Sequence, residues 1–299
     1  MTTFIMMVGL VGSGKSTRAK ILAEEYDANI HSSDAIREEL SGDINNQDIN
    51  DLVFRTLHNR IKEDLRNNKN CIYDATNINY KRRMAFLQEL KNIPCEKICV
   101  LMATQYETCL ERNAKRDRCV PEDVIKRMYM NFDPPHVYEG WSDMIVVYDD
   151  TNYRLPNNFY LRNKHFNQDN THHTLTLGEH CAAVCAELNN ASAELKLAGM
   201  LHDCGKPFCK TFKNMKGEIT EQAHYYNHEH TGSYDSLFYR EHPSKADTLY
   251  IAVLIRWHMQ PYFWERDNNE KLHKKYRRLW GEELYNDIMK LHEADKNAH

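Results

Sequence analysis

The sequence predicts an α/β domain, a parallel sheet flanked by helices, followed by an all-α domain. In the first half, short apolar runs alternate with longer helical patterns, which is typical of parallel α/β structure. After residue 175 the pattern is helical almost throughout. Thirteen of the sixteen histidines follow residue 151, which indicates that the two domains carry different chemistry. We expect a first domain over 1–150, a linker over 151–170 and a second domain over 171–299.

The apolar runs of the first domain define its expected strands. The first run, Thr3–Val8, predicts a buried strand, which a Gly-rich turn and a helix through Ala23 follow. The other expected strands are a short one ending at His31–Ser32, then Cys71–Tyr73, Lys97–Met102 and Met144–Tyr148. Proline suits the first turn of a helix. The other expected helices are Asp34–Leu40, Ile49–Leu65, Lys81–Leu90, Tyr106–Arg116 and Pro121–Met130.

The second domain begins after a polar stretch. Residues 150–175 carry Asn, Asp, Pro, His and Thr without periodicity, so we interpret this stretch as the linker region. The helices expected after it are Leu177–Leu188, Ala191–Leu201, His228–Tyr239, Ala246–Trp257, Lys271–Trp280 and Glu282–Asp295.

The composition limits the classes of protein that the chain can belong to. A content of 41% hydrophobic and 27% charged residues is ordinary for a globular protein. No apolar run approaches the length that spans a bilayer, so we expect no membrane partner and a cytoplasmic location. The nine cysteines form no CxxC pair, which favours reduced thiols. A net charge of −4 argues against a broad surface coated by nucleic acid.

The strongest motif of the first domain directly follows the first strand. The stretch Gly9–Thr17 fits GxxxxGK[ST] and opens a helix, which is the context that a phosphate-binding loop requires. Its glycines let successive backbone N–H groups point at phosphate oxygens. Lys15 would reach the β- and γ-phosphates of ATP or another NTP, and Ser16 would hold Mg²⁺. The expected nucleotide-binding residues are Gly9, Gly12, Ser13, Gly14, Lys15, Ser16 and Thr17.

A carboxylate and an arginine follow the second strand. Asp34 would lie near the phosphate loop of a parallel sheet, where it could accept a proton from an attacking hydroxyl. Arg37, one helical turn further on, could bind an anionic substrate. Asp34 could also be a helix N-cap, and the two roles are compatible.

Two further groups of polar residues favour a kinase. Asp74 and Asn77 leave a strand end, where ligands bind in open parallel sheets, although turn chemistry explains them equally well. Arg112 and Arg116 share a helix face, where they could form a basic lid over the γ-phosphate. A solvated charged face is the alternative interpretation of these arginines.

Together these motifs resemble the 5′-hydroxyl polynucleotide kinase family over about the first half of the chain. The resemblance rests on the phosphate loop, Asp34 with Arg37, the Asp-x-Thr-Asn at 74–77 followed by Lys81-Arg82-Arg83, and Arg112–Arg116 with Val120-Pro121. It implies that Asp34 is the general base on the 5′-OH, that Arg37 holds the neighbouring 3′-phosphate, and that Arg116 is the lid arginine on the donor phosphates. The donor side would include Arg112, and the acceptor side would include Asp74, Asn77 and Arg83. Related P-loop kinases act on seryl-tRNA or small metabolites and share a similar Asp and Arg.

The second domain carries a His-Asp pair at a helix end. His202 and Asp203 can present an imidazole and a carboxylate to one divalent cation, and Lys206 would stand near an anion. The other candidate ligands lie in or near expected helices: His180, His228, His258 and Asp295. A mixed nitrogen and oxygen set suits Mn, Fe, Co, Ni, Zn or Mg without choosing among them.

This order of ligands resembles the HD superfamily of phosphohydrolases over roughly 170–299. The resemblance implies that one metal is held by His180, His202, Asp203 and Asp295, and a second by His228 and His258. Asp203 would bridge the two metals, an activated water would attack phosphorus, and Lys206 would steady the substrate phosphate. The weaker candidates are His172, His173, His224 and His230.

The two halves together resemble bifunctional HD-and-polynucleotide-kinase proteins that heal nucleic-acid ends. We therefore expect NTP-dependent phosphorylation of 5′-OH ends and metal-dependent removal of 2′,3′-cyclic, 2′- or 3′-phosphate. The expected partner is an RNA end in preference to a DNA end, with a separate ligase acting afterwards. The alternative is a small-molecule or aminoacyl-tRNA kinase fused to an HD nucleotidase. A further alternative makes the second domain a nucleotide-sensing module without turnover.

Overall fold

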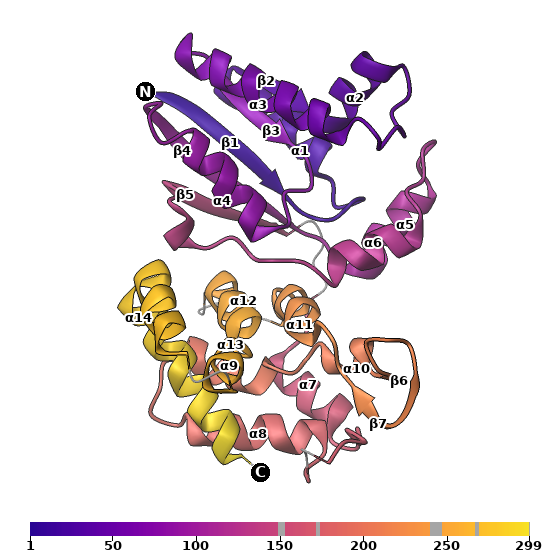
Figure 1. Ribbon diagram of the computed structural model, residues 1–299, viewed down its shortest axis with the longest axis vertical. Helices are drawn as coiled ribbons and strands as arrows, with labels where there is room; N and C mark the ends of the chain where they lie inside the picture. The colour runs from indigo at the N-terminus through magenta and orange to yellow at the C-terminus, as the bar shows by residue number, and fades with distance from the viewer. Residues whose placement is uncertain (149–152, 172–173, 240–246, 267–268, 299) are drawn as a thin grey trace. The chain divides into compact units, whose positions relative to one another are not determined.

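The computed structural model describes residues 1–148, 153–171, 174–239, 247–266 and 269–298. The chain forms two compact units, which Figure 1 shows by element. The first unit comprises Met1–Met128 and Pro135–Thr151, and the second comprises Tyr129–Pro134 and Asn152–His299. No helix among the described residues is long and apolar enough to cross a membrane.

A five-stranded parallel sheet forms the centre of the first unit, as the sequence predicts (Figure 1). The central strand is apolar on both faces, and Phe4–Val8 are all buried, as expected for a strand covered by helices on both sides. In spatial order the strands are β2 (Ala28–Ser32), β3 (Asn70–Asp74), β1 (Thr2–Val8), β4 (Cys95–Ala103) and β5 (Asp143–Tyr148).

The helices of the first unit bury one face each. On the third helix the buried residues Val53, Leu57, Ile61 and Leu65 recur every fourth position, which places them on one stripe. The helices are α1 (Lys15–Tyr26), α2 (Ser33–Ser41), α3 (Asn50–Arg66), α4 (Tyr80–Glu89), α5 (Tyr106–Ala114) and α6 (Glu122–Tyr129), with a 3-10 turn η1 (Val137–Glu139).

The parallel order brings the carboxyl ends of β1, β2 and β3 to one edge of the sheet. Ser32 and Asp74 are partners in the register of β2 and β3. The N–H of Gly9, just after β1, donates to the carbonyl of Thr76 at 2.9 Å. Loops that leave this edge therefore meet, which is where open parallel sheets bind ligands.

A buried ion pair ties α4 to η1 in the first unit. Arg83 donates from Nε to Oε2 of Glu139 at 2.8 Å and from Nη2 to Oε1 at 2.7 Å. Both side chains are fully buried. Trp141 also donates to Glu139 Oε2, at 3.2 Å. A bidentate pair with a further donor satisfies charges that would otherwise be costly to bury.

The second unit is mainly helical, as predicted. Its eighth helix breaks at Gly281, whose φ of 76° is non-helical; the sequence predicts two helices that separate at this position. The helices are α7 (Pro156–Asn163), α8 (Leu177–Glu187), α9 (Ala193–Leu201), α10 (Lys206–Cys209), α11 (His228–Ser236), α12 (Thr248–Trp257), α13 (Gln260–Arg266) and α14 (Glu270–Asn297).

Three features of the second unit differ from the expectation. The stretch interpreted as a linker contains α7, which starts with Pro156 and buries Phe159. A two-stranded hairpin of β6 (Thr211–Lys213) and β7 (Ile219–His224) adds a small sheet to the predicted all-α domain. The segment Tyr129–Pro134, which precedes the expected linker, belongs to this unit.

Candidate active sites

The phosphate loop of the first unit has the backbone that its glycines allow. Gly12 and Gly14 have backbone φ angles of 83° and 89°, which residues other than glycine rarely adopt. A Cβ on Gly12 would lie 2.3 Å from the carbonyl oxygen of Cys109 on α5. Glycine is therefore required there by both conformation and space. Gly9 and Ser13 lie in the same loop, and Ser13 is buried.

Lys15 and Ser16 begin α1 at the end of this loop. Lys15 Nζ donates to the carbonyl of Leu10 at 2.6 Å. Burial lowers the pKa of Lys15 to about 8, while Asp74 opposes the shift. Ser16 Oγ donates to Asp74 Oδ2 at 2.7 Å. A hydroxyl beside a carboxylate is the kind of oxygen pair that Mg²⁺ prefers, so these residues fit the ion that a phosphate loop implies.

A cavity of about 990 Å³ opens beside the loop within the first unit. It brings together most of the predicted kinase residues. Those that line it are Gly12, Gly14, Lys15, Ser16, Thr17, Asp34, Arg37, Asp74, Arg112 and Arg116. The candidate base, the phosphate loop and the candidate lid arginines therefore line one cavity.

Asp34 lies in the first turn of α2, and Ser32 is the N-cap residue. The N-cap interpretation of Asp34 is therefore wrong, because the helix starts one residue before it. Asp34 Oδ1 accepts from Arg37 Nη1 at 2.8 Å, and its Oδ2 accepts from Arg118 Nη1 at 3.0 Å. Arg37 also donates from Nη2 to Asn50 Oδ1 at 2.8 Å.

Two predicted acceptor residues do not line the cavity. Asn77 adopts a φ of 46°, and its side-chain amide donates to the carbonyl of Met7 at 2.9 Å. Arg83 is buried against Glu139 and donates to the carbonyl of Asn77 at 2.9 Å. Its neighbour Arg82 lines the cavity instead. The basic run at 81–83 could not show which arginine faces the site, because that depends on where α4 begins.

Several residues that line the cavity are not among the predicted site residues. Arg118 belongs to the basic run after α5, where no spacing distinguished it from its neighbours. The others come from the segment between α2 and α3 and from the start of α3. They carry no motif, and they are Asn45, Gln47, Asn50 and Phe54.

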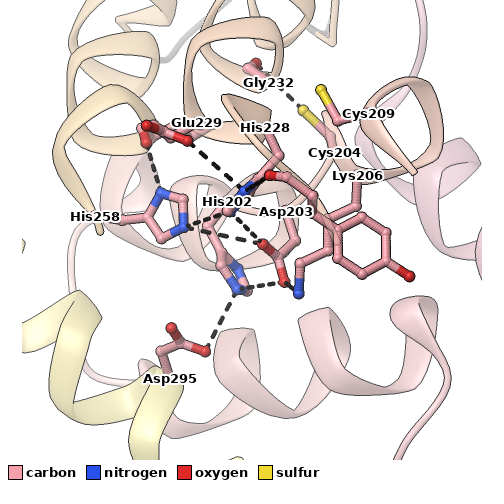
Figure 2. A network of polar contacts seen from close by, with 12 residues as sticks. His202, Asp203, Cys204, Lys206, Cys209, His228, Glu229, Gly232, His258 and Asp295 are labelled. Carbon is pink, nitrogen blue, oxygen red and sulfur yellow. Dashed lines mark hydrogen bonds and ion pairs between the residues drawn. The ribbon is translucent and has the colours of Figure 1, made fainter. Parts of the chain in front are cut away.

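The second site gathers side chains from five helices of the second unit. His180 lies on α8, His202 and Asp203 follow α9, His228 starts α11, His258 follows α12 and Asp295 lies on α14. All six are buried. Figure 2 shows Asp203 among His202, His228 and His258, with Asp295 beside His202. The structure therefore brings together every predicted ligand of this domain.

The ligand atoms form two groups that share Asp203. In the first, His180 Nε2 lies 3.0 Å from Asp295 Oδ1 and 3.2 Å from His202 Nε2. In the second, His228 Nε2 lies 3.2 Å from Asp203 Oδ1 and 3.4 Å from His258 Nε2. Asp203 turns its other oxygen, Oδ2, toward His202 Nε2 at 3.3 Å. One carboxylate thus faces both groups.

The outer nitrogens of the four histidines fix their orientation. Each Nδ1 contacts a backbone carbonyl, which only accepts hydrogen bonds, so Nδ1 carries the proton in a neutral ring. Each Nε2 is then an acceptor that points into the cluster. The Nδ1–O distances are 3.0 Å for His180, 2.9 Å for His202, 2.8 Å for His228 and 2.6 Å for His258.

Electrostatics in the cluster fit a cation. Burial lowers the pKa of His202, but Asp203 and Asp295 raise it well above its ordinary value. Burial also lowers the pKa of His258 to about 3, and His202 and His228 add to this shift. The carboxylates of Asp203 and Asp295 stabilise a positive charge at the centre of the cluster. Because the imidazole and carboxylate acceptors converge there, they can bind a divalent ion in place of a proton. The donor set therefore fits the metal that the sequence predicts.

Neighbouring polar groups surround the ligands. Lys206 Nζ lies 2.6 Å from Asp203 Oδ2 and donates to Gln168 Oε1 at 2.8 Å. Tyr262 donates to Asp295 Oδ2 at 2.9 Å. No sequence motif points to Gln168, which lies in the expected linker, or to Tyr262.

Two of the weaker histidine candidates, His224 and His230, lie outside the two ligand groups. His230 Nδ1 donates to the carbonyl of Phe132 at 2.9 Å. His224 ends β7. His172 and His173 fall outside the described residues. Cys181 Sγ lies 4.0 Å from His202 Nδ1, a nitrogen already bonded to a carbonyl, and burial raises the pKa of its thiol, so a thiolate ligand is disfavoured.

Comparison with known families defines the two units. Residues 4–135 match the family model described as an AAA domain, and residues 171–298 match the model of the HD domain. An AAA-type P-loop domain is therefore followed by an HD domain in this chain. Its parallel sheet and helical second unit confirm the predicted fold class.

Individual relatives cover about half of the chain. L-seryl-tRNA(Sec) kinase of Methanococcus maripaludis is 28% identical over 152 residues, 49% of this chain and 59% of the relative, so the chain spans less than two thirds of that protein. A sugar kinase from Janibacter sp. HTCC2649 is 17% identical with a TM-score of 0.38, over 50% of this chain and 86% of its own. A gluconokinase from Sinorhizobium meliloti 1021 is 17% identical with a TM-score of 0.35, and the match covers 49% of this chain and 82% of the gluconokinase chain.

Proposed function

We propose that the first unit transfers the γ-phosphoryl group of ATP to a hydroxyl of an aminoacyl-tRNA or a small molecule, and that the second hydrolyses a nucleotide phosphoester. One observation carries the kinase half of this proposal: Asp34 lines the same cavity as Lys15 and Ser16. A carboxylate in the space that receives the triphosphate can act on an acceptor hydroxyl at the γ-phosphate. The relation to L-seryl-tRNA(Sec) kinase supports an acceptor of this class.

Each candidate residue of the first unit would have a separate role in the phosphoryl transfer. Lys15 and the loop N–H groups would hold the β- and γ-phosphates, and Ser16 and Asp74 would hold Mg²⁺. The acceptor oxygen bonds to the γ-phosphorus while the bond to the bridging oxygen breaks and ADP leaves. Asp34 takes the hydroxyl proton. Arg112 and Arg116 would neutralise the charge that develops on the transferred group.

Charge in the cavity favours an acceptor that is itself anionic. Two carboxylates, Asp34 and Asp74, oppose a larger number of cationic side chains on the described lining. A triphosphate with its magnesium does not need so many positive groups, so some can serve a phosphate of the acceptor. The cationic residues are Lys15, Arg37, Arg82, Arg112, Arg116, Arg118 and Arg127.

In the second unit, His180, His202, Asp203 and Asp295 would hold one divalent ion, and Asp203, His228 and His258 a second. Bound ions of this kind activate water and polarise a phosphoester. Lys206 fixes the carboxylate of Asp203 at 2.6 Å and would place positive charge near the substrate phosphate. Tyr262 orients Asp295 through its hydroxyl.

A second candidate function is the healing of polynucleotide ends. The excess of arginines in the cavity supports it equally, because a 5′-OH strand carries phosphates beside its reacting hydroxyl. In this case Arg37 would hold the neighbouring phosphate, and the second unit would remove a 2′,3′-cyclic, 2′- or 3′-phosphate. RNA ends would be the partners, and a separate ligase would act on the products.

One set of reactions separates the candidates. The protein is incubated with γ-labelled ATP, Mg²⁺ or Mn²⁺, and one acceptor at a time: seryl-tRNA, a panel of sugars and nucleosides, or an RNA with 5′-OH and 2′,3′-cyclic phosphate. We expect Lys15-dependent labelling of seryl-tRNA or a small molecule. Labelling of the RNA 5′ end alone, with loss of its cyclic phosphate, would favour end healing. No labelled acceptor, with the Lys15→Ala variant as blank, would contradict both.

A further inference from the structure

Both carboxylate oxygens of Asp34 are occupied by arginines. Arg37, on the same helix, donates to Oδ1 at 2.8 Å. Arg118, from the loop between α5 and α6, donates to Oδ2 at 3.0 Å. A carboxylate that takes a proton from a hydroxyl must bring one oxygen within hydrogen-bond reach of it. An acceptor hydroxyl therefore has to compete with these arginines for the lone pairs of Asp34.

The contact with Arg118 is the better placed to yield. Arg37 is buried and is held in addition by Asn50 at 2.8 Å. Arg118 and Asp34 expose 23% and 43% of their side chains, and an ion pair this accessible to water is weak. An anionic ligand in the cavity can compete for the Arg118 guanidinium, because arginine binds phosphate and carboxylate with the same fork of donors.

Arg118 also connects two sides of the cavity. Its Nε donates to Asn45 Oδ1 at 2.8 Å while Nη1 holds Asp34. Asn45 belongs to the segment that joins α2 to α3, and all three residues line the cavity. The planar guanidinium can reach both partners at once, whereas the single ammonium of a lysine cannot reproduce this bridge.

We propose that Arg118 is a positioning residue that competes with water for Oδ2 of Asp34 until an acceptor binds. In the free protein Arg118 donates to Oδ2, and an anionic acceptor draws the guanidinium away, which leaves Oδ2 to the acceptor hydroxyl. This contact of Arg118 with Asp34 suppresses the hydrolysis of ATP by water. In that side reaction a water oxygen bonds to the γ-phosphorus and the bond to the bridging oxygen breaks. Asp34 takes the proton, and the products are ADP and phosphate. The proposal rests on the proposed role of Asp34 as the kinase base.

The test is ATP hydrolysis in the absence of any acceptor. Phosphate release is measured with Mg²⁺ and ATP for the unaltered protein, Arg118→Ala and Arg118→Lys. We expect Arg118→Ala to hydrolyse ATP about 10²-fold faster, the low end of what a positioned general base contributes. The rate of Arg118→Lys should lie between those of the unaltered protein and Arg118→Ala, because a lysine can reach Asp34 but cannot contact Asn45 at the same time. A merely structural arginine would lower the rate when removed.

Double variants assign the gain to Asp34 and to the phosphate loop. Combining Arg118→Ala with Asp34→Asn, or with Lys15→Ala, should abolish the gain and bring the rate of ATP hydrolysis to the starting level or below it. Arg60→Ala is the matched control, since Arg60 pairs with Glu39 on the surface at 2.5 Å and does not line the cavity. Arg60→Ala should leave the rate of ATP hydrolysis unchanged.

The proposal is overturned if Arg118→Ala and Arg118→Lys both leave hydrolysis unchanged or lower it. It is also overturned if the faster rate survives Asp34→Asn. Because no acceptor is present, this result does not depend on which acceptor is correct. A failed acceptor panel alongside a faster, Asp34-dependent Arg118→Ala variant would reject only the proposed substrate class.

Discussion

At the scale of single residues, hydrogen bonds of Nδ1, the ring nitrogen that faces away from the cluster, orient the candidate histidine ligands. Each histidine gives its Nδ1 proton to a backbone carbonyl, so its Nε2 has to face inward as an acceptor. Asp203 divides its two oxygens between the groups. The order of residues in the sequence indicates these candidate ligands, but not the backbone carbonyls that contact their Nδ1 atoms, because those contacts depend on the tertiary structure.

Metal binding provides a residue-level prediction. Protein stripped with a chelator should bind one Mn²⁺ in each ligand group and unfold at a higher temperature once loaded, because an ion that binds only the folded state stabilises it. His258→Ala should lose the ion of the second group, and Asp203→Ala should weaken both. Metal content by mass spectrometry and thermal unfolding would measure this. Equal metal content in all three proteins would contradict the assignment.

Tyr262 offers a smaller change at the same site. Tyr262→Phe removes the hydrogen bond to Asp295 Oδ2 without emptying space. Loss of such an outer partner should weaken metal binding by about 10- to 100-fold, as measured by calorimetry with Mn²⁺. The matched control is Tyr250→Phe, whose hydroxyl donates to Asp287 away from the ligands. An unchanged affinity in Tyr262→Phe would show that Asp295 needs no such partner.

At the scale of elements, the ion pair of Arg83 shows that a basic residue beside a binding motif can belong to the scaffold. Its fork on Glu139 joins α4 to η1, and neither side chain reaches water. The pair fixes the segment that leads into β5. Arg82, one position earlier on α4, points to the cavity instead.

Breaking this pair should destabilise the first unit. Glu139→Ala leaves the Arg83 charge buried and uncompensated, which should cost about 3–5 kcal/mol of unfolding free energy. Chemical denaturation followed by the unit's own fluorescence or circular dichroism would measure it. Glu39→Ala, which breaks the exposed pair with Arg60, serves as the control and should leave the free energy of unfolding nearly unchanged. Similar losses in both variants would contradict a scaffold role for Arg83.

Elements with a clear apolar period could be predicted from the sequence. The buried run of β1 and the stripe of α3 are examples. Elements without that signal were missed. Phe159 is a single large apolar anchor in the short helix α7, and β7 buries only Ala223 among its described residues, so neither shows a repeating pattern. The segment that carries Asn45 has no motif, although it lines the cavity.

At the scale of the whole molecule, the second unit includes a segment from before the expected linker. Phe132 is fully buried, and its ring lies 4.9 Å from that of Tyr234. Asp133 accepts from Arg256 Nε at 2.6 Å. These contacts are with α11, which begins at the candidate ligand His228, and with α12, which the candidate ligand His258 follows. The HD unit is therefore not one continuous stretch of chain.

Removing this anchor should weaken the second unit. Phe132→Ala should cost about 3–5 kcal/mol of unfolding free energy, because it leaves a cavity against Tyr234. Thermal unfolding of the full chain, read together with metal content, would show the loss. Phe263→Ala is the control, since Phe263 is 41% exposed. A stability equal to that of the unaltered protein would show that the Tyr129–Pro134 segment is not part of the HD core.

The claim on which the account depends is that the chain builds two separate sites for phosphorus chemistry. The most direct measurement is to assay ATP-dependent phosphoryl transfer and Mn²⁺-dependent hydrolysis of a generic phosphoester in Lys15→Ala and in Asp203→Ala, with unfolding curves for both. Lys15→Ala should lower phosphoryl transfer by about 10²-fold or more and leave hydrolysis unchanged, and Asp203→Ala should do the reverse. Loss of both activities in either folded variant would contradict the account.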